Sequence, residues 1–259
     1  MKRTPIAAVP EAVPSRFHVL LAGADLYDSS CSEDARVYFI DREGGYYLKT
    51  APKGTLEAEN RLTRFFNSKG LAPEVLAYEQ SQRDWLLTRR VPGEDCTCRQ
   101  YLDDPKRLCE TLAYLLRGLH DTDVTGCPVF DHTGTYLRTA YHNYQAGRYD
   151  LSYYSDGRAS VREAWSLVQA YAGSLKNDTL LHGDFCLPNI MLDHWQFTGF
   201  IDLGRGGIGD RHVDIYWGAW TLRYNLKTDA YRDRFLDAYG RERIEPEILN
   251  AIGAFEVFG

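Results

Sequence analysis

The sequence predicts an α+β protein, with a small, mostly antiparallel sheet near the N-terminus and a larger helical part after it. Three observations support this class: strand-like alternation of apolar residues between 36 and 88, helical spacing after 93, and a short return to alternation between 180 and 203. We therefore expect two lobes, 1–92 and 93–259, and the cleft between two such lobes is the usual place for a ligand.

The N-terminal lobe begins with a predicted hairpin. Residues 36–40 and 46–49 alternate as strands do and flank a polar turn with two glycines. A helix is expected from about 55 to 68, ended by Gly70 and Pro73. Two further short strands are expected at 74–78 and 85–88, which completes a small sheet with one helix packed on it.

The C-terminal lobe carries clear helix starts. Asp104 is a good N-cap and is followed by proline at the first helical position, and the leucines after it keep helical spacing as far as His120. Ser160 and Glu163 have the spacing of a capping box at the start of another helix. Residues 189–192 and 197–201 predict a second hairpin, and helical texture resumes from 213 to the end.

Composition limits the partners and the compartment. The net charge of −6 over 259 residues argues against nucleic acid and anionic membrane as partners and is compatible with a cationic ligand. The six dispersed cysteines form no CxxC pair, which favours reduced thiols over a zinc site or a disulfide framework. No signal peptide and no run of 18 apolar residues is visible. We expect a cytoplasmic protein.

The residues that indicate chemistry surround the second predicted hairpin. Asp184 and Asn189 lie five residues apart at its mouth, and Asp202 closes its second strand before Leu-Gly. Phosphoryl transfer needs the acceptor oxygen in line, a metal to neutralise phosphate charge, and a carboxylate to orient the hydroxyl. Asp184 would accept the proton, and the oxygens of Asn189 and Asp202 suit Mg²⁺. Each residue alone could simply end a strand or cap a turn, but the combined spacing predicts a phosphotransferase.

The segment His-Gly-Asp-x4-Asn at 182–189, followed by Gly-Phe-Ile-Asp-Leu-Gly-Arg at 199–205, resembles the aminoglycoside phosphotransferase family. Residues 186–191 and 209–215 are most similar to its aminoglycoside 3′-phosphotransferases, and the likeness runs over nearly the whole chain, including 83–87 and 91–95. The resemblance implies a bilobal, protein-kinase-like fold. It also implies transfer of the γ-phosphate of ATP or GTP to a hydroxyl of an aminoglycoside, at the 3′ position, and so antibiotic resistance.

The resemblance also implies a nucleotide site. Lys49 resembles the lysine that contacts the α- and β-phosphates, and Glu59 resembles its ion-pair partner, which fixes a flexible ammonium group. Residues 86–91 resemble the connector that receives the adenine base. The loop over the triphosphate would be formed by Ser29, Ser30 and Ser32. This loop is equally compatible with a plain hairpin turn, and no Walker A sequence occurs.

The remaining expectations concern the transfer site and the acceptor. Arg205 either neutralises charge at the transfer site or braces Asp184. A polycationic aminosugar needs carboxylates around it, and the residues expected to supply them are Asp150, Asp156 and Glu256. Phe255 stands where an aspartate is common in the family.

Two alternatives stay open. One keeps the kinase chemistry but changes the acceptor to choline, an amino sugar or another small alcohol. The other is a non-catalytic nucleotide-binding module, which the presence of every element needed for transfer disfavours. The expected partners are a nucleoside triphosphate and a small-molecule acceptor, with neither nucleic acid nor membrane, and the chain is expected to be a monomer or weak dimer.

Overall fold

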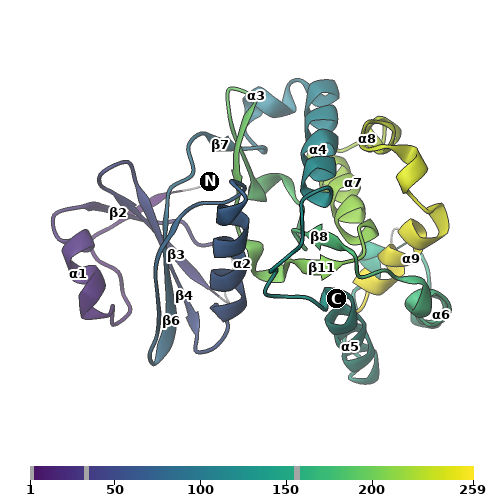
Figure 1. The fold of residues 1–259 in the computed structure, drawn as a ribbon, viewed down its shortest axis with the longest axis horizontal. Coiled ribbons are helices and arrows are strands. Elements are labelled where there is room, and N and C mark those ends of the chain that lie inside the picture. The colour runs from purple at the N-terminus through teal and green to yellow at the C-terminus, as the bar shows by residue number, and fades with distance from the viewer. Residues whose placement is uncertain (1–2, 32–34, 155–157) are drawn as a thin grey trace. The chain divides into compact units, whose positions relative to one another are not determined.

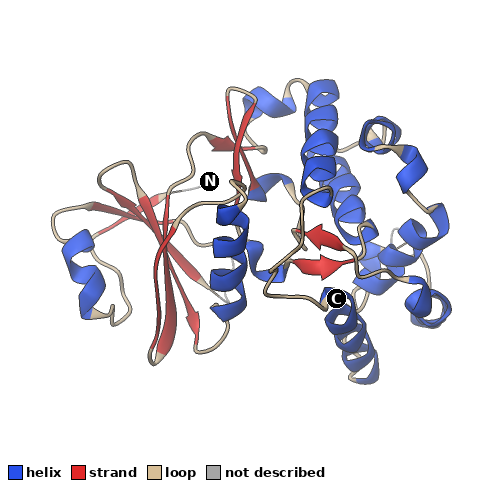
Figure 2. Cartoon of the chain, in the orientation of Figure 1, coloured by secondary structure: helices blue, strands red, loops and turns tan. Residues whose placement is uncertain are grey.

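The computed structural model describes residues 3–31, 35–154 and 158–259, and the chain divides into two compact units (Figure 1). The first unit consists of Met1–Asp95 and Pro188–Gly204. The second unit consists of Cys96–Leu187 and Arg205–Gly259. Figure 2 shows the contrast between them, because most of the strands belong to the first unit and most of the helices to the second.

Within the described residues, the first unit contains a six-stranded antiparallel sheet in the order β1-β2-β3-β4-β6-β5. Its strands are β1 (Thr4–Ile6), β2 (Asp25–Asp28), β3 (Arg36–Asp41), β4 (Tyr46–Pro52), β5 (Val75–Gln80) and β6 (Arg83–Arg89). Two helices accompany it, α1 (Ser15–Leu21) and α2 (Glu57–Ser68). The predicted hairpin, helix and two further strands of this lobe are therefore confirmed.

Alternation along β4 explains how this sheet buries both faces. Leu48 packs in one apolar cluster with Trp85 and with Phe17 of α1. Ala51 belongs to a second cluster, with Leu56 at the start of α2. Because successive side chains of a strand point to opposite faces, Lys49 lies on the face away from Leu48, the face that α2 covers.

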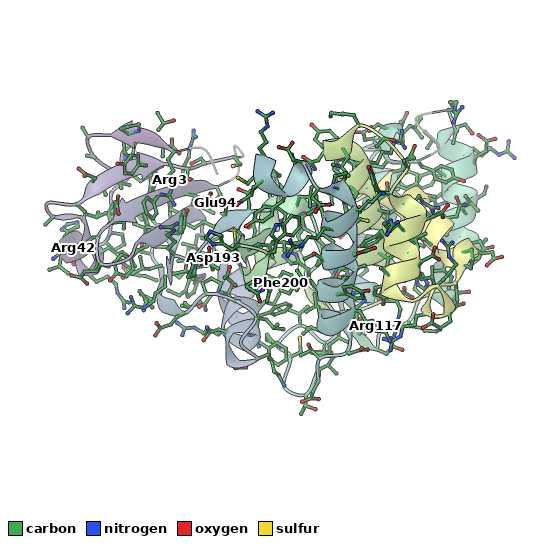
Figure 3. All side chains as sticks on the ribbon, turned by 90° about the horizontal axis from the view of Figure 1, so that it is seen from above. Arg3, Arg42, Glu94, Arg117, Asp193 and Phe200 are labelled. Atoms are coloured by element: carbon green, nitrogen blue, oxygen red, sulfur yellow. The ribbon has the colours of Figure 1, made fainter. Side chains whose placement is uncertain are left out.

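A second, three-stranded sheet in the order β10-β9-β7 completes the first unit. Its strands are β7 (Glu94–Asp95), β9 (Ile190–Asp193) and β10 (Gln196–Phe200). Glu94 pairs with Leu192 beside Asp193, and the backbone N–H of Phe200 donates to Leu71 O at 2.7 Å (Figure 3). Residues 188–204 therefore belong to the first unit by their contacts, which differs from a single boundary at residue 92.

The second unit is mainly helical. Its helices are α3 (Arg99–Leu102), α4 (Pro105–His120), α5 (His132–Gln145), α6 (Val161–Tyr171), α7 (His212–Leu226), α8 (Arg232–Tyr239) and α9 (Pro246–Glu256). Strands β8 (Thr179–Leu181) and β11 (Gly207–Gly209) form a short antiparallel ladder. A buried cluster joins Val168 of α6, Leu181 of β8, Val213 of α7 and Phe255 of α9.

The predicted caps of this unit are confirmed. The Asp104 side chain accepts from Arg107 N at the start of α4, and Ser160 and Glu163 form both hydrogen bonds of the capping box at the start of α6. Helix α5 was not predicted, because it buries only Thr133 and Ala140 and so shows little apolar periodicity. Among the helices of the described residues, none has the length and apolarity that crossing a membrane requires.

Candidate active site

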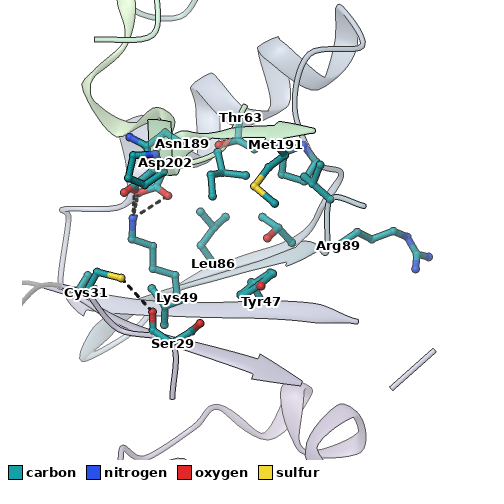
Figure 4. A pocket seen from close by; sticks show the side chains of 18 residues that line it. Ser29, Cys31, Tyr47, Lys49, Thr63, Leu86, Arg89, Asn189, Met191 and Asp202 are labelled. Atoms are coloured by element: carbon teal, nitrogen blue, oxygen red, sulfur yellow. Dashed lines mark hydrogen bonds and ion pairs between the residues drawn. The ribbon is translucent and has the colours of Figure 1, made fainter. Parts of the chain in front are cut away.

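A lysine held between two carboxylates lies at the centre of the first unit. Lys49 Nζ lies 2.8 Å from Glu59 Oε2 on α2 and 2.5 Å from Asp202 Oδ1, the residue that follows β10 by two positions (Figure 4). Burial alone would lower the pKa of Lys49, but Glu59 and Asp202 hold it above its ordinary value. The ammonium group is therefore charged and fixed in place.

This lysine lines a cavity of about 270 Å³ within the first unit. Its apolar part includes Leu86 and Val91 of the predicted connector, together with Val37 and Met191. Tyr47 adds an aromatic side chain, and Lys49, Asn189 and Asp202 form the polar end (Figure 4). A cavity with a mainly apolar lining and a few charged groups suits a nucleotide, whose base is flat and apolar and whose phosphates are anionic.

Asn189 and Asp202 have the chemistry of magnesium ligands. Both line the cavity beside Lys49. The backbone carbonyl of Asn189 accepts from Ile201 N at 3.0 Å, and this bond joins the start of the hairpin to its end. Asp202 has a left-handed backbone with φ of 61°, a conformation that aspartate tolerates better than most residues. No group of three His, Cys, Asp or Glu side chains in the described residues could hold a metal. Asn189 and Asp202 would leave the rest of a Mg²⁺ shell to phosphate and water.

The predicted serine loop is placed only in part. Ser29 is buried, lines the cavity and donates its backbone N–H to Val37 O at 2.8 Å. The hydroxyl of Ser30 accepts from Val37 N at 3.0 Å, so it supports the turn between β2 and β3. Ser32 lies outside the described residues.

Asp184 belongs to the second unit. The backbone just before it is held by hydrogen bonds to a buried aspartate. The backbone N–H groups of His182 and Gly183 donate to the two carboxylate oxygens of Asp214 at 2.7 and 2.8 Å. Burial opposes the charge of Asp214, but donation from His120 and His182 keeps its pKa below the usual value. Asp214 thereby fixes the backbone that presents Asp184.

Sequence reasoning gave no role to Asp214. The available signal was an acidic residue between Val213 and Ile215 at the start of an apolar helix, since a buried charge requires partners. Gly183 is required in the same segment. It has φ of 80°, and a Cβ there would lie 1.9 Å from Arg205 O.

Arg205, Asp184 and Glu256 share one electrostatic environment in the second unit. The pKa of Glu256 is raised to about 7, mainly by burial and also by Asp184, against the opposing effects of Arg205 and of hydrogen bonds from Tyr136 and Trp217. Tyr136 donates to Glu256 Oε1 at 2.7 Å. The structure therefore places three predicted site residues within reach of one another's charge.

Asp150, another predicted acceptor residue, is exposed. Hydrogen bonds from the side chain and the backbone N–H of Ser152 lower the pKa of Asp150, and the backbone bond to its Oδ1 measures 2.9 Å. Its backbone N–H donates to Val257 O at 2.8 Å, next to Glu256. Asp156 lies outside the described residues. Phe255, which stands where an aspartate was expected, is buried and stacks on Tyr136 at 5.6 Å.

A second cavity, of about 420 Å³, lies in the second unit and has an aromatic lining that the sequence did not indicate. The aromatic residues are Tyr153, Tyr154, Tyr216, Trp220 and Tyr224. Trp220 and Tyr224 stack with ring centroids 4.9 Å apart on successive turns of α7. Burial, Asp150 and Glu256 raise the pKa of Tyr153 and Arg205 lowers it, so this cavity adjoins the charges described above.

Comparison with known proteins identifies the family. The profile of the phosphotransferase enzyme family matches residues 29–249. A probable aminoglycoside 3′-phosphotransferase of Lactococcus lactis subsp. lactis (strain IL1403) is 47% identical over 252 residues, 96% of each chain. A streptomycin 3″-kinase of Streptomyces griseus is 31% identical over 252 residues, 90% of each chain. The crystal structure of aminoglycoside-3′-phosphotransferase of type VIII has a TM-score of 0.76 at 25% identity, covering 92% of this chain and 94% of that one.

The fold is that of a kinase-like phosphotransferase. The chain belongs to the phosphotransferase enzyme family, and the resemblance to the aminoglycoside phosphotransferases, with its protein-kinase-like fold, is confirmed.

Proposed function

We propose that this enzyme transfers the γ-phosphate of ATP or GTP to a hydroxyl of an aminoglycoside antibiotic, at the 3′ position, in a reaction that requires Mg²⁺. The observation that carries the proposal is Lys49, fixed by Glu59 and Asp202 at the wall of the first unit's cavity. The names of the relatives support the acceptor class. The 3′ position is favoured over 3″ by the higher identity to the Lactococcus protein.

In the first unit, the base would lie against Leu86, Val91 and Met191, and the ammonium of Lys49 would contact the phosphates. The bond to Glu59 holds this ammonium group, at the end of a flexible side chain, in one position. Ser29, Ser30 and Ser32 would form the loop beside the triphosphate. Ser29 and Ser30 directly follow β2, so their position depends on the same sheet that carries Lys49.

Asn189 and Asp202 would hold Mg²⁺. When bound, this ion neutralises phosphate charge and orients the γ-phosphate for transfer. The two residues supply an amide and a carboxylate oxygen from opposite ends of one hairpin. The hydrogen bond between Ile201 N and Asn189 O fixes the two ends relative to each other.

In the second unit, Asp184 would accept the proton of the acceptor hydroxyl as that oxygen bonds to the γ-phosphorus. The bond from the γ-phosphorus to the bridging oxygen breaks, and the nucleoside diphosphate leaves with that electron pair. Asp214 keeps the backbone of residues 182–183 rigid, so Asp184 does not reorient during the step. Arg205 would balance the negative charge near the transfer site.

The acceptor would bind in the aromatic cavity, with Asp150, Asp156 and Glu256 as its carboxylates. Sugar rings present apolar faces, and ammonium groups are attracted to the faces of Trp and Tyr. Trp220 and Tyr224 are the aromatic pair we assign to that contact. Lys227 Nζ lies 4.2 Å from the centre of the Tyr224 ring, so an acceptor ammonium group would replace it there. We further propose that the enzyme acts in the cytoplasm as a monomer or weak dimer, without nucleic acid or membrane partners, and confers resistance.

A matched pair of acceptors tests the proposal. Kanamycin B and tobramycin differ in the 3′-hydroxyl, which tobramycin lacks. With Mg²⁺ and ATP, and then GTP, we expect nucleoside diphosphate release with kanamycin B, none with tobramycin, and none with excess EDTA or in Asp184→Ala. Equal release with both acceptors would exclude the 3′ position. Nucleoside diphosphate release that no aminoglycoside stimulates would indicate a kinase of another alcohol.

A further inference from the structure

A buried carboxylate that does not line the cavity accepts a hydrogen bond from the residue just before α2. Asp84 of β6 has no exposed surface, and its Oδ2 accepts the backbone N–H of Leu56 at 2.9 Å. Leu56 occupies the N-cap position of α2, and this helix has no side-chain cap of its own. In a capping box the carboxylate of the N3 residue accepts the N–H of the N-cap residue. Glu59 holds the N3 position of α2 but pairs with Lys49, and Asp84 of a neighbouring strand accepts that N–H instead.

The charge of Asp84 suits this position. Burial alone would raise the pKa of Asp84, but the neighbouring N–H groups of Gly54 and Leu56 and the side chains of Tyr78 and Gln80 keep it below the ordinary value. Its Oδ1 is buried without a hydrogen-bond partner among the described residues, so the bond from Leu56 N to Oδ2 is the one that fixes this side chain. A carboxylate at the N-terminal end of a helix is also favoured by the helix dipole. An ionised Asp84 therefore fixes where α2 begins.

Asp84 is linked both to the strand that carries Lys49 and to the helix that carries Glu59. In the pairing of β4 with β6, Asp84 lies opposite Ala51 and Lys49 lies opposite Leu86, so all four lie on the face that α2 covers. Glu59 follows Leu56 by three residues. Asp84 therefore holds the start of the helix that carries Glu59 against the two strands that place Lys49.

We propose that Asp84 is a positioning residue of the nucleotide site, which keeps Glu59 at its distance from Lys49 without itself contacting nucleotide. This inference rests on the proposed function, because it assigns the pair of Lys49 and Glu59 to phosphate binding. It gives a role to Asp84 in the Arg83-Asp-Trp-Leu-Leu segment, of which the proposed function uses only Leu86. In this role Asp84 acts on nucleotide only through Glu59.

A double-mutant cycle tests that dependence. Asp84→Asn, which keeps the volume and one acceptor oxygen, is placed in the wild-type and in the Glu59→Gln background, and ADP affinity and kcat/KM for ATP are measured. We expect Asp84→Asn to weaken both by about tenfold in the wild type and by less than about twofold beside Glu59→Gln. Thermal unfolding in each variant confirms that it is folded.

Thr50→Val is the matched control. Thr50 is fully buried in β4, accepts from Arg83 Nε at 3.1 Å, and lies opposite Trp85 on the other face of the sheet. We expect this variant to lose stability while keeping ADP affinity within about twofold. An equal loss from Asp84→Asn in both backgrounds, or the same loss from Thr50→Val, would overturn the inference.

The readouts separate this inference from the proposed function. ADP binding needs no acceptor, so it tests Asp84 even if no aminoglycoside is turned over, a result that would overturn the proposed function alone. A wild-type protein that binds no ADP would overturn both. Normal turnover in the wild type with no effect of Asp84→Asn would overturn only the inference.

Discussion

The two units solve different recognition problems with different chemistry. In the first unit, a lysine is fixed by two carboxylates, and the residues that line the cavity come from the sheet, α2 and the second hairpin. In the second unit, the cavity is lined by five aromatic side chains, and its nearby carboxylate, Glu256, has a pKa raised to about 7. The first site is built around a fixed ion pair. The second combines an aromatic surface with the charged side chains of Arg223, Asp229 and Arg232 and a nearby carboxylate of raised pKa.

This difference follows from the ligands that we assign to the two units. A triphosphate carries the same charges at the same spacing in every turnover, so rigid ionic partners suit it. Aminoglycosides vary in ring arrangement and in the number of amino groups. Aromatic faces accept many orientations of a sugar ring or an ammonium group. The following predictions ask whether the two sites can be altered separately.

The largest effect is expected from Asp184→Ala in the second unit. Loss of the proton acceptor should reduce kcat by about a thousandfold, while ADP affinity in the first unit stays within about twofold. Steady-state kinetics and ADP titration check both numbers. Asp103→Ala, at an exposed position, is the control and should leave both unchanged. A comparable loss of ADP affinity in Asp184→Ala would contradict the separation of roles.

The next effect concerns pH and the stability of the second unit. Because the pKa of Glu256 is raised in the folded state, its proton stabilises the fold below the unfolded-state pKa near 4.5, and this contribution is lost as pH rises through about 7. Relative to Glu256→Gln, the free energy of unfolding should fall by about 3 kcal/mol between pH 4.5 and 8.

Denaturant unfolding of the wild type and of Glu256→Gln across that pH range checks the sign and the size of this effect. Glutamine resembles the protonated acid, so the two proteins should be close in stability at the acidic end. A difference that stays constant with pH would show that Glu256 titrates normally despite its burial.

A smaller effect is expected in the first unit. Lys49→Met should reduce kcat/KM for ATP by about a hundredfold, because the fixed cation is lost while Glu59 and Asp202 remain as two adjacent carboxylates. The KM for the acceptor should be unchanged within about twofold. Lys53→Met, at an exposed position of the same unit, should have no effect. A rise in acceptor KM as large as the rise in nucleotide KM would contradict the comparison.

The smallest effect is expected from the aromatic cavity. Tyr224→Leu should raise the KM for the acceptor by about five- to tenfold with kcat nearly unchanged, because one face of the stacked pair with Trp220 is lost. Tyr114→Leu is the matched control, since Tyr114 is also an exposed helical tyrosine but does not line the cavity. Equal acceptor KM values in the two variants would show that Tyr224 does not contribute to acceptor binding.

The sequence by itself determined the local parts of this protein. The capping box at Ser160 and the hairpin between Asn189 and Asp202 form as predicted, because caps, turns and alternation depend on residues close in the chain. The same local spacing indicated phosphotransferase chemistry. The residues expected to act in it were named from the sequence, and their roles stay predictions.

Only the tertiary structure decided which distant residues meet. Lys49 and Asp202 are 153 positions apart and form an ion pair, and Asp214 holds the segment before Asp184. The five aromatic residues of the second cavity come from two segments. The spacing of Tyr216, Trp220 and Tyr224 places them on one face of α7, but only packing brings Tyr153 and Tyr154 to the same cavity. Such contacts depend on how elements pack after they form, and packing is set by the whole chain rather than by any one segment.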